Sequence, residues 1–167
     1  GRKYLNLFLL IPMYFSGGMI PAFLLITKLG LYANPLSQII PACFSIWNII
    51  LMKAFFSSIP EGMREAAKID GCSTFGIYRK IILPLSQNGL ATLTVLTFNS
   101  VWNDYMGPMI YLDSDRLKTI QLGLASFQQQ FSADYGAIMA GTVCSVIPII
   151  IVYCIGQKYI VEGVAFA

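Results

Sequence analysis

The charged side chains, which are the groups able to move protons or to hold ions and partners, gather in one stretch of the chain. Residues 57–87 carry three carboxylates among four basic residues: Glu61, Glu65 and Asp70 with Arg64, Lys68, Arg79 and Lys80. Acid–base catalysis needs groups positioned around one reacting proton. The acidic residues of this chain are too scattered to propose such a pair.

Signatures of catalysis are missing from the sequence as well. It has no histidine, the commonest general base and metal ligand, and no GxxxxGK[ST], GxSxG, HExxH or GxGxxG pattern. Its four cysteines are widely spaced without a CxxC pair, which argues against a disulfide framework or a zinc site. Its basic residues have no aromatic platform for nucleic acid. We therefore predict a protein that is not an enzyme and has no cofactor or metal of its own.

The polar stretch is predicted to begin with a short helix. Ser58 and Glu61 have the spacing of a capping box, with Pro60 in the first turn, where its missing N–H costs little. Asp70-Gly71 is predicted to end the helix, because glycine readily takes the left-handed conformation that closes a C-terminus. A second short helix is predicted to follow, capped by Ser73 or Thr74.

Pro84 follows the second short helix and marks a kink or a stop before the next apolar run. On the first helix, helical spacing places Met63, Ala66 and Ala67 on one side, and the adjacent alanines leave a shallow surface that suits close approach by another backbone. Periodicity alone leaves two interpretations open: a docking surface, or an amphipathic loop that lies on a membrane surface.

Long uncharged runs surround the polar stretch and predict an all-α, polytopic membrane helix bundle. Hydrophobic residues make up 56% of the chain and charged residues only 11%, well below the roughly 25% of soluble domains. Four runs are each long enough to span a bilayer as a helix: residues 4–27, 29–52, 81–103 and 135–157. Pro12, Gly17-Gly18 and Pro21 predict a bend in the first helix. We expect the second and third helices to cover about 36–56 and 86–111, within one transmembrane domain over residues 1–167.

The basic residues are divided unequally between the two sides of the predicted membrane. Four crossings place residues 57–87 and both ends of the chain on one side, which then holds eight basic residues. The other side holds three: Lys28, Arg116 and Lys118. The positive-inside rule therefore predicts that the polar stretch of this multi-pass protein is cytoplasmic.

The third predicted helix carries more polar side chains than any other apolar run. Asn99, Trp102, Asn103 and Asp104 lie toward its outer end, and polar groups at membrane depth are costly unless they face protein or water. We expect these four residues to line a pathway. The alternative is an interfacial aromatic belt, which Trp102 would satisfy unaided. Residues 112–134 are predicted to form an extracytoplasmic loop that contacts another protein, dips into the bundle or is simply solvated.

The order of residues in the polar stretch resembles a known family. It is similar to the EAA loop of permease subunits of ABC importers that depend on a binding protein. The matching residues are Glu65-Ala66-Ala67, Asp70-Gly71, Tyr78, Ile81 and Leu83-Pro84. The resemblance implies that the first short helix is a coupling helix that docks on a separate ATPase. Glu65 would then make a polar contact, Ala66 and Ala67 would pack closely, and Asp70-Gly71 would form the turn.

The resemblance extends over nearly the whole chain and favours the carbohydrate branch, which includes maltose-type permeases. A stretch of that branch has a tryptophan, an asparagine, an acidic residue and an aromatic before a proline, as do Trp102 to Tyr105 and Pro108 here. The first sixty residues resemble a branch of Gram-positive bacteria associated with oligosaccharide or uronate uptake. The family usually has six spanning helices, so we expect the first two to be missing from this chain.

The implied protein moves sugars or oligosaccharides by alternating access. Its partners would be ATPase subunits that bind ATP and magnesium, a second permease in a heterodimer, and an extracytoplasmic binding protein. A permease for peptides or amino acids is the alternative within the family. An ion-driven carrier or a membrane scaffold without an ATPase is the alternative from another class. A carrier is expected to place ionisable groups at mid-membrane, and the four runs contain no charged residue.

Overall fold

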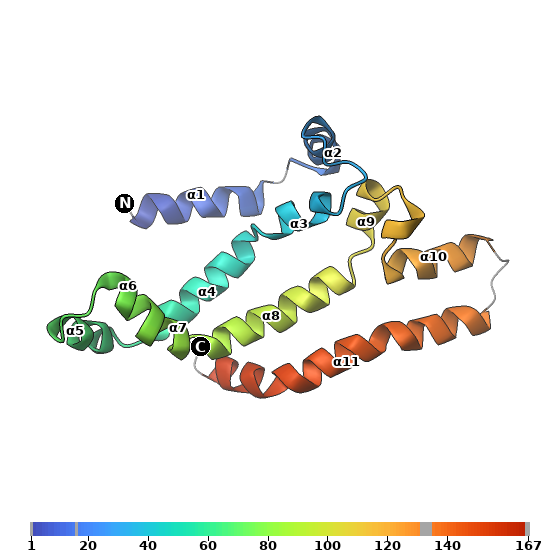
Figure 1. Ribbon diagram of the computed structural model, residues 1–167. Helices are drawn as coiled ribbons and strands as arrows, with labels where there is room; N and C mark the ends of the chain where they lie inside the picture. The colour runs from blue at the N-terminus through green and yellow to red at the C-terminus, as the bar shows by residue number, and fades with distance from the viewer. Residues whose placement is uncertain (1, 16, 131–134, 166–167) are drawn as a thin grey trace. The chain divides into compact units, whose positions relative to one another are not determined.

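A computed structural model describes residues 2–15, 17–130 and 135–165, and this part of the chain contains helices and no strand (Figure 1). The prediction of an all-α fold is confirmed. The α-helices are α1 Arg2–Tyr14, α2 Met19–Lys28, α3 Leu36–Ala42, α4 Ile46–Ser58, α5 Glu61–Ile69, α6 Thr74–Ile77, α7 Leu83–Leu85, α8 Gln87–Trp102, α9 Met106–Tyr111, α10 Ile120–Gln130 and α11 Tyr135–Ala165. A π-helical turn, η1 (Tyr78–Ile82), and a 3-10 turn, η2 (Asp115–Leu117), complete the order.

The four predicted spans fall on stretches that are long and apolar enough to cross a membrane. Leu36–Ser58 and Tyr135–Tyr159 meet these criteria alone. Two bent pairs meet them when each pair is taken as one span: Asn6–Tyr14 with Met19–Lys28, and Thr74–Leu85 with Gln87–Trp102. By length and composition, the described chain therefore has two such helices, or up to four.

Two of the predicted helices are interrupted, although Leu36–Ser58 still qualifies as one span. The helix expected over 36–56 is interrupted between α3 and α4, just after Pro41, which has no N–H to donate to the carbonyl four residues back. The helix expected over 86–111 is interrupted between α8 and α9. There Asp104 Oδ1 accepts a hydrogen bond from the Gly107 N–H at 3.2 Å, so its side chain satisfies the first turn of α9. The bend predicted around Gly17-Gly18 is present: Gly18 has φ 87 and precedes α2.

The chain divides into two compact units. The first is made of Gly1–Ile46 and Ser100–Ile149, and the second of Trp47–Asn99 and Ile150–Ala167. In the first unit, α3 packs on α9, and the Ala33 N–H donates to the Tyr111 carbonyl at 3.0 Å. Phe23 of α2 stacks on Tyr111 with ring centroids 6.1 Å apart and meets Tyr32 edge-on at 5.7 Å. Aromatic contacts thus join α2, the following turn and α9.

In its described part, the segment predicted as a loop over 112–134 forms η2 and α10. Asp115 and Lys118 form an ion pair at 2.6 Å, and the hydrogen bond and charge of Lys118 lower the pKa of the Asp115 carboxyl. A Cβ on Gly141 of α11 would lie 2.6 Å from the Leu124 side chain, which shows how closely α10 approaches α11. Residues 120–130 are therefore helical, and the predicted role of this segment stays a prediction.

The contacts that join the second unit include a polar bond between helices and two close approaches at glycines. Asn48 Nδ2 of α4 donates to Thr97 Oγ1 of α8 at 3.1 Å. A Cβ on Gly89 of α8 would lie 2.6 Å from the Phe55 ring, and one on Gly156 of α11 would overlap Val95. Small residues let helices approach closely in membranes, where hydrogen bonds between helices add further stability.

We predict that the Asn48–Thr97 hydrogen bond contributes about 0.6 kcal/mol, with about 1.7 kcal/mol as the upper bound for such bonds in membranes. A double-mutant cycle with Asn48→Ala and Thr97→Val, measured by reversible unfolding in detergent, isolates this coupling. Thr94→Val is the matched control, because the Thr94 hydroxyl donates to the Leu90 carbonyl within its own helix. A coupling energy no larger than that of Asn48→Ala with Thr94→Val would contradict the assignment.

Candidate functional site

The first loop helix, α5, begins differently from the prediction. Its N-cap is Pro60, with φ −58 and ψ 132, and no side chain caps it. The capping box expected between Ser58 and Glu61 was wrong, because α4 continues through Ser58 and its hydroxyl donates to the Phe55 carbonyl at 2.8 Å. Glu61 instead forms an ion pair with Arg64, one turn along α5.

The C-terminus of α5 is closed by a Schellman motif, as Asp70-Gly71 predicted. Gly71 has φ 78, the left-handed region that favours glycine. Its N–H donates to the Lys68 carbonyl at 3.0 Å, and the Cys72 N–H donates to the Ala67 carbonyl at 3.0 Å. Two carbonyls that would otherwise lack partners are thereby satisfied, and the chain reverses direction after α5.

The second loop helix, α6, packs against α5 and gives the loop a small core. Ser73 is its N-cap: its Oγ accepts a hydrogen bond from the Gly76 N–H at 3.1 Å, which decides between Ser73 and Thr74. Ala67 of α5 is 4% exposed and Ile77 of α6 is 3% exposed. Ala67 therefore lies inside the loop, while its neighbour Ala66 is exposed.

The outer surface of the loop is charged and apolar at the same time. Glu65, Ala66, Asp70 and Gly71 are exposed, and Glu65 forms no ion pair within the described residues. Ile69 follows Glu65 by one helical turn and is 86% exposed. A single exposed apolar side chain is common on protein surfaces, but no other large apolar side chain of the described residues is as exposed as Ile69.

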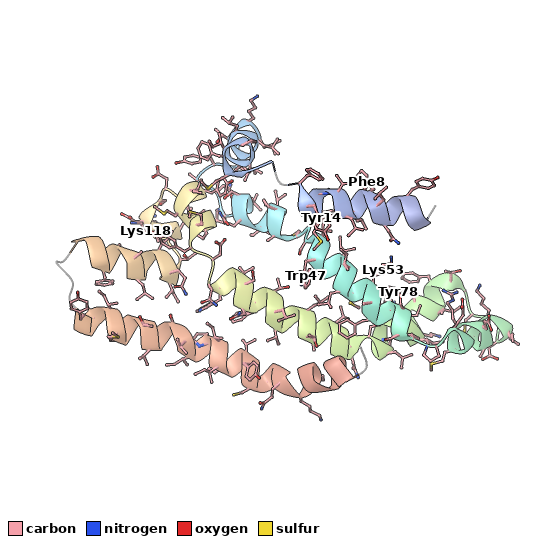
Figure 2. All side chains as sticks on the ribbon, turned by 180° about the vertical axis from the view of Figure 1, so that it is seen from behind. Phe8, Tyr14, Trp47, Lys53, Tyr78 and Lys118 are labelled. Carbon is pink, nitrogen blue, oxygen red and sulfur yellow. The ribbon has the colours of Figure 1, made fainter. Side chains whose placement is uncertain are left out.

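Sequence reasoning missed the apolar part of this surface. Ile69 and Phe75 are both largely exposed, and the Phe75 and Tyr78 rings lie 6.3 Å apart (Tyr78 is labelled in Figure 2). The signal was available: Ile69 lies four residues after Glu65, so helical periodicity places both on one face. We name Glu65, Ala66, Ile69 and Phe75 the outer loop surface.

The residues predicted to line a pathway have more than one role in the structure. In the first unit, Trp102 is half-buried and its Nε1 donates to the Ser145 carbonyl of α11 at 3.0 Å. Asp104 is half-buried at the start of α9, where it holds the Gly107 N–H, and Asn103 between them is exposed. Asn99, on the α8 portion of the second unit, is exposed. Trp102 and Asp104 thus bond the backbone of helices, and Asn103 is exposed.

Gln38 is a further polar residue near Asp104 that the sequence did not identify. A Cβ on Gly107 would lie 2.6 Å from Asp104 Oδ2 and 2.7 Å from Gln38 Oε1, so both side chains converge over this glycine. Gln38 Nε2 is buried and has no hydrogen-bond partner in the described part of the chain. The local pattern of α3 gives no sign of this contact, because it joins segments far apart in the sequence.

Comparison with known proteins places these features in a family. Residues 2–165 match the family model described as "Binding-protein-dependent transport system inner membrane component". The chain is 39% identical over 88% of its length to the probable ABC transporter permease protein YurM of Bacillus subtilis strain 168. It is 36% identical over 98% of its length to the polygalacturonan/rhamnogalacturonan transport system permease protein YtcP of the same strain.

A solved structure has the same fold. The chain is 33% identical to a chain in the crystal structure of a bacterial ABC transporter involved in the import of the acidic polysaccharide alginate, with a TM-score of 0.85 over 96% of its length. The chain spans 50% of YurM, 62% of YtcP and 62% of the solved chain.

The Schellman closure of α5 gives a graded prediction at Gly71. No atom lies within 4 Å of a Cβ added there, so the cost of a side chain comes from the left-handed backbone alone. We expect Gly71→Val to cost about 1–2 kcal/mol locally and Gly71→Asn much less, since asparagine tolerates this conformation. Amide hydrogen exchange of Cys72 and the last turn of α5 should accelerate about tenfold or more in Gly71→Val. Equal exchange in the two variants would contradict the assigned turn.

Proposed function

The chain belongs to the family of binding-protein-dependent transport system inner membrane components, and on that premise we propose that it is the membrane-spanning permease subunit of an ATP-driven importer. Its substrates are sugars or oligosaccharides, moved by alternating access. The names of its relatives support this substrate class: YtcP is a polygalacturonan/rhamnogalacturonan permease, and the solved neighbour takes part in alginate import.

The observation that carries the proposal is the build of the α5–α6 loop. Ala67 and Ile77 are buried within it, and the Schellman motif fixes its turn, so the loop has a defined shape. The same loop leaves Glu65 and Ile69 exposed on one face. A loop with a defined shape and an exposed face that is both charged and apolar suits a coupling helix that docks on a separate ATPase.

We assign the two kinds of residue on the outer loop surface different tasks. Burial of an exposed isoleucine side chain contributes about 1.5–3 kcal/mol, so Ile69 supplies docking energy. Glu65 makes a polar contact that fixes orientation. Ala66 allows close approach, and Ala67 transmits force because it packs within the loop. Gly71 keeps α5 at a fixed angle to α6.

The remaining partners follow from the family and from the distribution of charge. A second homologous permease completes the pathway in a heterodimer, an extracytoplasmic binding protein delivers the solute, and the ATPase subunits bind ATP and magnesium. Eight basic residues on the side of the loop against three on the other support a cytoplasmic loop in a bacterial plasma membrane. Our candidates for the pathway remain the exposed Asn99 and Asn103 and the half-buried Trp102 and Asp104.

Substitution of Ile69 tests the docking surface. We expect Ile69→Ala to weaken binding of the ATPase to the purified full-length protein by about 10–100-fold, which corresponds to about 1.5–3 kcal/mol. Leu96→Ala is the matched control, since Leu96 is also an exposed apolar residue, on α8. Titration calorimetry or biolayer interferometry in nanodiscs measures both. If the two variants bind the ATPase equally well, the docking assignment is wrong.

A second pair of variants separates docking from transmission. Ala67→Trp forces a large side chain into the loop core, and Ala66→Ser changes only the exposed neighbour. We expect Ala67→Trp to abolish ATP-driven uptake in proteoliposomes while ATP hydrolysis continues, and Ala66→Ser to transport at close to the normal rate. Normal uptake by Ala67→Trp would show that the loop core plays no part in coupling.

A further inference from the structure

The helix that leads from the loop toward α8 contains one unusual turn. In η1 the Leu83 N–H donates to the Tyr78 carbonyl, five residues back, where an α-helix uses the carbonyl four residues back. A turn of this kind holds one residue more than an α-helical turn. Such π-helical turns are rare and occur frequently at functional sites.

Pro84 provides the physical reason for the wide turn. In an α-helical register, residue 84 would donate to the carbonyl of Lys80, but proline has no N–H and its ring would clash with that carbonyl. Widening the preceding turn moves the carbonyl away from the ring. The wide turn is therefore a response to Pro84, and an N–H at position 84 would remove its cause.

A sharp bend follows directly. Ser86 is buried; its N–H donates to the Ile82 carbonyl at 3.0 Å and its hydroxyl donates to the same oxygen at 2.7 Å. The axis of Thr74–Leu85 then meets that of Gln87–Trp102 at 65°. A serine side chain that bonds the helix backbone often bends a helix, as it does here.

A cavity of 340 Å³ lies beside this bend. Phe55, Ile59 and Met63, from the end of α4 to the start of α5, line one side, and Leu85, Ser86 and Gly89 line the other. Well-packed interiors contain few spaces larger than a water molecule. The open volume therefore leaves room for the start of α5 to move relative to the start of α8.

We propose that η1 and the bend at Ser86 form a hinge that carries movement of α5 into α8, with the wide turn that Pro84 imposes as its flexible element. This inference rests on the proposed function, because it assumes that α5 receives movement from a partner. Replacement of the wide turn by an α-helical turn would rotate the helix on one side by about 100° relative to the other, since an α-helix has 3.6 residues per turn. Pro84 prevents this replacement.

Spin labels test the hinge in the full-length protein in nanodiscs. In a background with the four cysteines replaced by serine, labels are attached at Thr74→Cys and Leu96→Cys, both exposed positions of the second unit. Double electron–electron resonance then measures the distance between the labels. We expect Pro84→Ala to supply the missing N–H and to shift this distance by up to about 9 Å, the chord of a 100° rotation at a helix radius of about 5–6 Å. Leu85→Ala, the neighbouring exposed residue, should leave it unchanged.

Removal of the extra residue provides a rescue. Deletion of Lys80 together with Pro84→Ala gives a regular α-helix whose two flanks keep their original orientation, so we expect the distance of the unsubstituted protein to return. This double variant should lack the hinge and therefore lose ATP-driven uptake while it still binds the ATPase. If Pro84→Ala alone fails to fold, the double variant still tests the proposal through its uptake. An unchanged distance in Pro84→Ala, or normal uptake by the double variant, would overturn the proposal.

The two proposals fail in different ways. The distance measurement needs neither an ATPase nor a substrate, so it reports on the turn alone. If the unsubstituted protein binds no ATPase, the proposed function fails whatever the labels show. If it binds the ATPase and takes up sugar but Pro84→Ala leaves the distance unchanged, only the hinge proposal fails.

Discussion

The packing of Ala67 against α6 is the contact on which the rest of the loop depends. Isolated helices of nine residues are marginal in water, so α5 cannot rely on its own hydrogen bonds. The buried Ala67 and Ile77 and the left-handed turn at Gly71 together hold α5 in place. An alanine at position 67 is small enough to permit this close approach. The exposed face of α5 is therefore presented in one orientation, which suits the docking that we propose.

The apolar helices obey a second constraint: every break in them needs local partners for the backbone, because lipid offers none. At the α8–α9 break the Asp104 carboxylate bonds the Gly107 N–H, and at the Ser86 bend the serine hydroxyl bonds the Ile82 carbonyl. Polar side chains in this chain thus stabilise interrupted helices. The same breaks give the apolar segments places where they can change shape, which the alternating access that we propose requires.

The features predicted correctly from the sequence depend on short-range chemistry. Gly71 closes α5 and Ser73 caps α6 because glycine conformation and serine hydrogen bonding act over a few residues. Predictions failed where a neighbouring helix competed, as at Ser58, which α4 retains. The sequence did not predict that Gln38 lies near Asp104, because this proximity depends on tertiary packing. The widened turn before Pro84 was missed because periodicity alone does not distinguish it from a kink.

Co-purification of the full-length protein from its native membrane tests the central claim most directly. The bound proteins are identified by mass spectrometry, for the unsubstituted protein and for a variant that combines Glu65→Gln with Gly71→Val. The account predicts that an ATPase subunit and a second permease remain bound to the unsubstituted protein, and that the variant loses the ATPase but keeps the permease. A preparation without an ATPase, or one in which the variant retains it fully, would contradict the account.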